Sequence, residues 1–90
     1  MARIGMDVDQ VEQASRELKA KADQISTVVS DIDRVVNGLL GVWDGPDAQQ
    51  FVHDWWPEHK SQLVAVSSHI SGLGQSAWNN AQEQRNVSGH

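Results

Sequence analysis

The sequence predicts an all-α protein, an antiparallel two-helix hairpin assembling as a four-helix-bundle dimer. Apolar residues recur every seven positions in both halves of the chain, which is typical of bundle helices. A Trp-Asp-Gly-Pro stretch at residues 43–46 interrupts this pattern midway. The apolar stripe of the first half is wider than one partner helix can cover, so we expect a second hairpin to cover the remainder. The 90 residues therefore form a single domain, residues 1–90.

The first helix is expected over residues 8–41. Asp7 and Asp9 can cap its N-terminus and oppose the helix dipole there. Glu12 and Arg16 lie four residues apart, in the order that favours an ion pair on a helix surface. Three apolar rows follow the heptad: Val11, Leu18, Ile25, Ile32 and Leu39; Ala14, Val28, Val35 and Val42; and Ala22, Val29 and Val36, which widen the stripe.

The chain is expected to reverse at residues 42–46. Gly45 permits a tight reversal, and Pro46 suits the first turn of a new helix, where its missing N–H costs no hydrogen bond. Asp44 or Gly45 would be the N-cap of that helix. Trp43 has two interpretations, because indole is amphipathic: a docking element exposed at the bundle tip, or a cover that shields the open end of the hairpin.

The second helix is expected over residues 46–82. Pro57 removes an interior hydrogen bond, so it either kinks or splits this helix near residues 54–56. The periodicity is lost toward the C-terminus, and we expect a frayed tail at residues 83–90.

Trp55 and Trp56 are adjacent in this helix and project about 100° apart, so both cannot face the same neighbour. One would face the first helix and the other the partner hairpin. Both would then be ordinary core residues, as apolar residues at helical spacing usually are, or one of them would be an interface anchor, a role that tryptophan often fills. The bundle and dimer face predicted from the two helices comprises Val11, Leu18, Ile25, Ile32, Leu39, Val52, Trp55, Trp56, Leu63 and Ile70.

Composition argues against several classes of partner. The chain has no cysteine, so it can form no disulfide and offers no thiolate to a metal. Its net charge is −5 and its Lys and Arg residues are not clustered, which argues against nucleic acid as a partner. No stretch has the roughly 18 apolar residues of a membrane span, and no apolar run follows the first residues as in a cleaved signal peptide.

The chemistry-bearing residues do not form a recognisable active site. His53 and His59 are six residues apart and lie on different faces of a helix, which does not suit a metal site. Ser67 and His69 are local neighbours without a supporting acid, so they do not make a catalytic triad. A slender hairpin also offers no concave site. We therefore expect no enzyme activity, no cofactor and no bound metal.

The tripeptide Trp43-Asp44-Gly45 lies midway along the chain, at the predicted turn, in a sequence without cysteine or a signal peptide. In this context the chain resembles, over nearly its whole length, the WxG family of about one hundred residues. Its members are the ESAT-type small substrates of type VII (ESX) secretion systems in actinobacteria and other Gram-positive bacteria. The resemblance implies a homo- or heterodimeric four-helix bundle that is exported folded and engages the secretion ATPase.

The C-terminal export signal of that family is commonly Tyr, three residues, then Asp or Glu, and this chain has no tyrosine. The protein is then either the dimer partner that lacks the signal or the bearer of a variant. The variant tail signal would comprise Trp78, Gln82 and Glu83, with the acidic residue one position later than in the family's pattern.

The resulting expectation is a small non-enzymatic protein, secreted without a cleaved signal peptide and cytoplasmic before export. It would act as a substrate or co-secreted partner of a type VII system, paired with itself or with a second WxG-type protein. Two alternatives stay open. The protein could be a chaperone-like helical partner of a larger type VII toxin, which obligate heterodimerisation would favour. It could also be a structural cytosolic coiled-coil module whose Trp-Asp-Gly stretch is only a turn.

Overall fold

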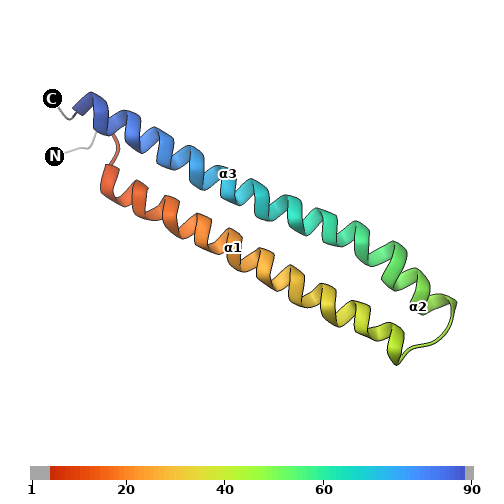
Figure 1. The fold of residues 1–90 in the computed structure, drawn as a ribbon. Coiled ribbons are helices and arrows are strands. Elements are labelled where there is room, and N and C mark those ends of the chain that lie inside the picture. Colours follow the sequence, from red (N-terminus) through yellow and green to blue (C-terminus); the bar gives the residue numbers. More distant parts are fainter. Residues whose placement is uncertain (1–4, 89–90) are drawn as a thin grey trace.

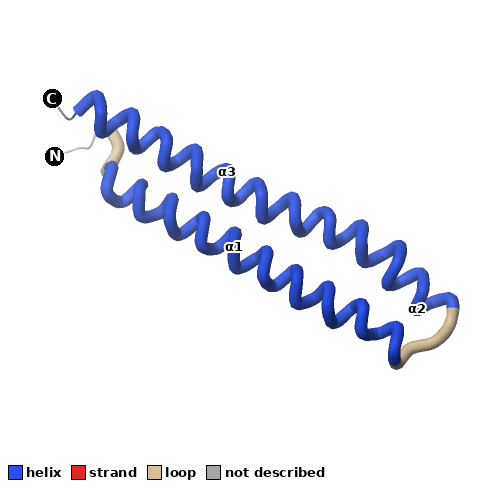
Figure 2. The backbone as a smooth tube through the Cα atoms, viewed as in Figure 1, coloured by secondary structure: helices blue, strands red, loops and turns tan. Residues whose placement is uncertain are grey.

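The computed structural model describes residues 5–88, which form two long antiparallel helices lying side by side (Figure 1). The first helix, α1, spans Val8–Gly38, and the second, α3, spans Trp56–Ser88. The backbone tube in Figure 2 is helical except at the chain reversal and just before α1. Within residues 5–88 there is no β-strand. The predicted all-α helical hairpin is therefore confirmed.

Local side-chain chemistry sets the N-terminal end of α1. The Asp7 side chain accepts a hydrogen bond from the backbone N–H of Gln10 at 3.2 Å, as an N-cap should. Asp9 places a negative charge in the first turn, where the helix dipole favours it. After Gly38 the chain continues for one tighter turn as the 3₁₀-helix η1, Leu39–Gly41.

The second helical arm is continuous past Pro57, and it contains a π-helical turn. It comprises the short helix α2 (Pro46–Gln50), the π-helical segment η2 (Phe51–Trp55) and α3. The backbone N–H of Trp56 donates to the carbonyl of Phe51, five residues back. Proline lacks an N–H and crowds the preceding turn, and a wider π turn directly before it accommodates both constraints. Pro57 therefore neither splits the arm nor ends it.

The two helices meet along a line of small residues, which we call the small-residue seam. The Ser15 hydroxyl donates to the Gly74 carbonyl at 2.6 Å, and the Ser67 hydroxyl donates to the Ala22 carbonyl at 2.8 Å. A Cβ atom added to Gly74 would lie 3.0 Å from the Ser15 carbonyl oxygen, so the backbones approach too closely for a side chain there. The buried members of the seam are Ser15, Ala22 and Val29 on α1 and Ser67, Gly74 and Ala81 on α3.

This seam corrects the predicted order of the apolar rows. The row expected at its centre contains the larger side chains, yet Leu18 and Ile25 are only half-buried and Ile32 is exposed. The buried row is the one expected to widen the stripe, with Ala22, Val29 and Val36. Small side chains allow close approach of the two backbones and hydrogen bonds between them, so they occupy the centre. The larger aliphatic residues are displaced to one edge of the contact.

Among residues 5–88, larger side chains are buried together near the chain reversal. Val36, Val52 and Trp56 form a core cluster there, and Leu39, Leu40 and Phe51 pack against it. The hydrophobic contribution to stability is therefore greatest at this end of the hairpin, because it scales with the apolar area removed from water.

The opposite end of the hairpin is joined by polar contacts, which we call the terminal clasp. One Arg85 nitrogen, Nη2, donates to Asp9 Oδ1 and to Glu12 Oε1, each at 2.9 Å. The Gln82 amide also donates to Glu12. The hydrogen bond from Arg85 is the main cause that lowers the pKa of Glu12.

The terminal clasp bears on two expectations. The helix α3 continues to Ser88, past the predicted helix end at residue 82, and residues 89–90 of the predicted tail lie outside the described part of the chain. Glu12 also pairs with Arg85 rather than with Arg16, whose guanidinium carbon lies 5.9 Å from the centre of a Trp78 ring. Contacts between the helices therefore replace the expected pair along one helix.

The described chain is a rod with its two ends at one extremity and the chain reversal at the other (Figure 1). Its extents are 67 × 21 × 16 Å. The radius of gyration is 20.1 Å, compared with about 12 Å for a compact domain of this length. Within residues 5–88, no helix combines the length and apolarity needed to cross a bilayer.

Candidate functional site

The hairpin tip holds Trp43, Asp44 and Gly45 between η1 and α2. The Trp43 backbone N–H donates to the Leu39 carbonyl at 2.8 Å, which fixes the start of the reversal. Gly45 then adopts φ = +115°, a conformation that is strained for any residue with a side chain. Gly45 is the N-cap residue of α2, with Pro46 in the first turn. The Trp43 side chain is 40% exposed.

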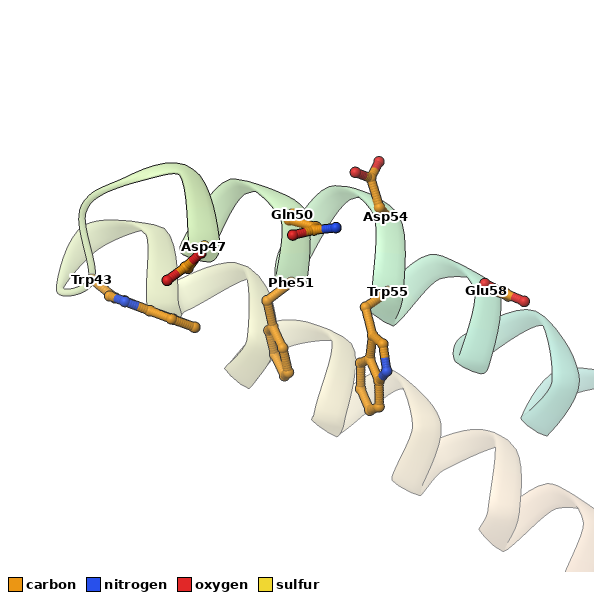
Figure 3. A pocket seen from close by; sticks show the side chains of 7 residues that line it. All are labelled: Trp43, Asp47, Gln50, Phe51, Asp54, Trp55 and Glu58. Atoms are coloured by element: carbon orange, nitrogen blue, oxygen red, sulfur yellow. The ribbon is translucent and has the colours of Figure 1, made fainter.

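An aromatic row runs from the tip along the second arm: Trp43, Phe51, Trp55 and His59. The ring centroids of Trp43 and Phe51 are 5.8 Å apart, and those of Phe51 and Trp55 are stacked at 5.0 Å. The Trp55 and His59 rings are stacked at 3.9 Å, and His59 Nδ1 lies 2.8 Å from the Trp55 carbonyl oxygen. Figure 3 shows Phe51 and Trp55 projecting from the same side of the arm, with Trp43 extending from the chain reversal toward them. The row thus presents successive ring edges and faces on one side of the tip.

A cleft of about 390 Å³ lies beside this row, and we call it the tip cleft. Three of its lining side chains are aromatic and three are carboxylates (Figure 3). The carboxylates come from successive segments of the arm, so they follow the aromatic row along its length. The lining residues are Trp43, Asp47, Gln50, Phe51, Asp54, Trp55 and Glu58.

The adjacent tryptophans 55 and 56 have different surroundings. Trp56 is 5% exposed, and its indole N–H donates to Asp33 Oδ1 on α1 at 2.9 Å. That hydrogen bond, followed by one from Lys60, holds the pKa of Asp33 below its usual range. Trp55 is 48% exposed and belongs to the aromatic row. One of the two therefore faces the first helix, as expected, and the other lies at the surface.

A second surface of interest is an apolar face along one edge of the hairpin. Val35 on α1 is 63% exposed, and Leu73 on α3 is 59% exposed. Ile25, Val28, Ile32 and Leu63 line a shared groove of about 380 Å³ between the helices. Helical spacing places further residues in line with this groove. We call the whole set the apolar face: Ile25, Val28, Ile32, Val35, Leu63, Val66, Ile70 and Leu73.

The opposite edge of the hairpin is linked by polar side chains. Lys19 Nζ donates to Gln75 Oε1 at 2.6 Å, and Lys60 Nζ lies 3.2 Å from Asp33 Oδ1. The terminal clasp follows the same edge. Polar groups on this edge are therefore satisfied within the hairpin, whereas the apolar face has no cover of its own.

The residues of the predicted dimer face are distributed unequally by the hairpin. Val52 and Trp56 are buried within it. Trp55, Ile32 and Leu63 are exposed, and the others are partly buried: Val11, Leu18, Ile25, Leu39 and Ile70.

The predicted tail-signal residues lie within α3. Trp78 is half-buried and faces Arg16, Gln82 is bonded to Glu12, and Glu83 is exposed. They therefore do not form one exposed group.

The serine and histidine side chains considered as candidates for catalysis or metal binding either contact structural partners or lie apart from one another. The Ser67 hydroxyl is used in the seam, where it also lies 2.9 Å from the Ser26 hydroxyl. His53 is exposed, while His59 stacks on Trp55. No group of three or more His, Cys, Asp or Glu residues suited to a metal ion occurs among residues 5–88.

Sequence reasoning missed Phe51 and His59 as members of the tip site. Both lie four residues from Trp55, one on each side. A spacing of four places side chains on one helical face, and this signal could have revealed the row.

Comparison with known proteins gave one match. The model of a family described as proteins of 100 residues with WXG matches residues 3–83. No curated protein and no solved structure matched the chain.

Proposed function

The chain belongs to the WXG100 family, and on that premise we propose that it is a small protein exported by a type VII secretion system. It acts by recognition and not by catalysis. It leaves the cytoplasm as a folded helical dimer without a cleaved signal peptide, and the secretion ATPase recognises its hairpin tip.

The placement of the Trp-Asp-Gly tripeptide carries this proposal. Trp43 lies at the extreme end of the rod, half-exposed, on a backbone fixed by η1 and Gly45. A side chain that only sealed the hairpin end would gain most by complete burial. The exposed indole instead offers a rigid amphipathic surface to another protein.

The apolar face supports dimerisation. It combines several exposed aliphatic side chains along one edge, while the other edge is polar and internally satisfied. Large exposed apolar patches on small proteins usually mark interaction sites. A second hairpin, either another copy or a related WxG-type protein, would bury this face in a four-helix bundle.

The tail residues support a role as the dimer partner without its own export signal. Gln82 is bonded within the terminal clasp, and Trp78 is half-buried against Arg16. Of the three residues, only Glu83 is exposed. Recognition would then combine the tip of this chain with a tail signal on its partner.

The test is export from a bacterium whose type VII system secretes the wild-type chain. Trp43→Ala should reduce the secreted fraction to background while the cytoplasmic protein remains helical and of unchanged mass. Val42→Ala is the matched control, because Val42 is the exposed neighbour of Trp43 and removing its two methyl groups leaves the tip rings intact. Equal export of wild type and Trp43→Ala, both folded, would overturn the proposal and favour a structural coiled-coil module.

A further inference from the structure

We propose that the tip cleft binds an arginine side chain presented by a partner protein. The inference specifies which chemical group the hairpin tip would recognise. It rests on the proposed function only for the partner's role in export. The tip cleft combines exposed aromatic rings with carboxylates that form no ion pair among the described residues. A planar cationic group could contact both kinds of side chain.

The charge distribution along the chain is the first argument. No Lys or Arg occurs between Arg34 and Lys60, whereas this stretch holds Asp44 and the three carboxylates of the tip cleft. The nearest cation in the sequence, Lys60, is bound to Asp33 on α1. Within the described residues, Asp47, Asp54 and Glu58 form no ion pair. A cation from outside would therefore meet no competing charge in the cleft.

The spacing of two carboxylates strengthens this argument. Asp54 and Glu58 are four residues apart in a continuous helical arm, an arrangement in which like charges destabilise a helix. Capping does not explain them, because both lie beyond the first turn after Pro46. A cation placed between them would turn this repulsion into attraction.

The aromatic row selects arginine over lysine. A guanidinium group is planar, stacks on aromatic faces and donates two parallel hydrogen bonds to a carboxylate. The exposed indole of Trp43, which only tilts against Phe51, supplies such a face. Trp55 stacks on Phe51 and on His59, so it lines the cleft with its ring edge. The cleft volume of about 390 Å³ falls within the range of roughly 300–1,000 Å³ that is typical of ligand pockets.

The experiment titrates the purified full chain with a blocked Gly-Arg-Gly peptide and follows the four tryptophan indole N–H signals by NMR. The same peptide with citrulline in place of arginine is the neutral control, and a lysine peptide tests the planar group. The arginine peptide should shift the signals of Trp43 and Trp55 but leave those of Trp56 and Trp78 in place. The citrulline peptide should shift none of them, and the lysine peptide should bind more weakly.

The variant Asp54→Asn/Glu58→Gln should weaken binding of the arginine peptide by about fivefold or more, as expected for the loss of two exposed ion pairs. The variant Glu17→Gln/Asp23→Asn removes the same charge from exposed positions on α1 and should bind within twofold of wild type. An unchanged Trp56 indole signal verifies that both variants remain folded, because that N–H is bonded to Asp33.

Four results would overturn the inference: no shift at millimolar peptide, equal binding of the citrulline peptide, equal binding of the lysine peptide, or equal weakening by the two double variants. These results are separable from a failure of the proposed function. Loss of export in Trp43→Ala without arginine binding would leave the proposed function standing and remove only this inference.

Discussion

Gly74 lies where α1 and α3 approach each other most closely in the small-residue seam. A Cβ atom at this position would lie 3.0 Å from the Ser15 carbonyl oxygen and 3.1 Å from Lys19 Cγ. At the same place the Ser15 hydroxyl donates a hydrogen bond to the Gly74 carbonyl, which joins residues 59 positions apart in the sequence. From the sequence alone, Gly74 is only a weak helix former. Its role in the contact between the helices depends on Ser15 of α1, and apolar periodicity does not identify that neighbour.

Gly74→Ala should therefore destabilise the protein by about 1–3 kcal/mol, the usual cost of forcing an extra group into a packed contact. Thermal unfolding followed by circular dichroism, at one fixed protein concentration, measures this change. Gly72→Ala is the matched control, because no atom lies within 4 Å of its added Cβ. It should stabilise the helix by roughly 0.5–1 kcal/mol. Similar shifts of both variants in the same direction would contradict the assigned close approach.

Other residues were predictable from the sequence because their roles are local. Asp7 caps α1 through a backbone group three residues away, and Pro46 lies in the first turn of α2. The diverging directions of Trp55 and Trp56 also follow from helical geometry alone. The choice of Trp56 as the buried one depends on Asp33, a partner from the other helix.

At the scale of elements, the π-helical segment η2 and the last turns of α3 differ most from expectation. Pro57 signals a disturbance, but the sequence does not specify whether a helix bends, breaks or widens in response. The last turns of α3 lack apolar periodicity, so the sequence does not predict that they are helical. They are held by the hydrogen bonds of Arg85 to Asp9 and Glu12 on the other helix. Both outcomes are decided by contacts or geometry beyond the local pattern.

The terminal clasp makes the stability of the hairpin depend on pH in a defined direction. The pKa of Glu12 is lowered from its ordinary value of 4.5, chiefly by the hydrogen bond from Arg85. The folded state therefore binds this proton more weakly than the unfolded chain. The resulting stabilisation is fully present above pH 4.5 and is lost as the pH falls through the lower pKa of the folded state.

Glu12→Gln should accordingly lower the melting temperature at pH 7 and flatten its decline below pH 4.5. Melting curves recorded from pH 7 to pH 2.5 test this, with Glu17→Gln as a control that removes one exposed carboxylate of α1 outside the clasp. An acid profile of Glu12→Gln that is as steep as the wild-type profile would show that the clasp does not contribute. Screening by salt should weaken the effect, because the groups are near the surface.

For the whole molecule, the main feature is that the apolar face stays exposed in the single hairpin. The width of the apolar stripe predicted that one partner helix could not cover it, and the exposed Val35 and Leu73 agree with that part of the argument. The sequence of one chain does not specify which partner covers the apolar face, because aliphatic side chains on a flat face can pack against many partners.

Ile32→Asp tests the proposed dimer, because Ile32 is 37% exposed in the single hairpin and would be buried by a second one. Light scattering on a sizing column should give about twice the 9.9 kDa chain mass for the wild type and the mass of one chain for the variant. Ser30→Asp introduces the same charge at an exposed position of α1 away from the apolar face and should remain dimeric. A wild-type mass for Ile32→Asp would exclude this face from the dimer.

The rod shape also determines what can be attached to the protein. Both ends of the described chain lie at the extremity opposite the hairpin tip, so a passenger joined to either terminus would be held nearly the full 67 Å from Trp43 (Figure 1). Such a fusion would leave the tip sterically accessible, whereas an insertion between η1 and α2 would obstruct it directly. The fold therefore separates the two ends of the described chain from the tip that we propose is recognised in export.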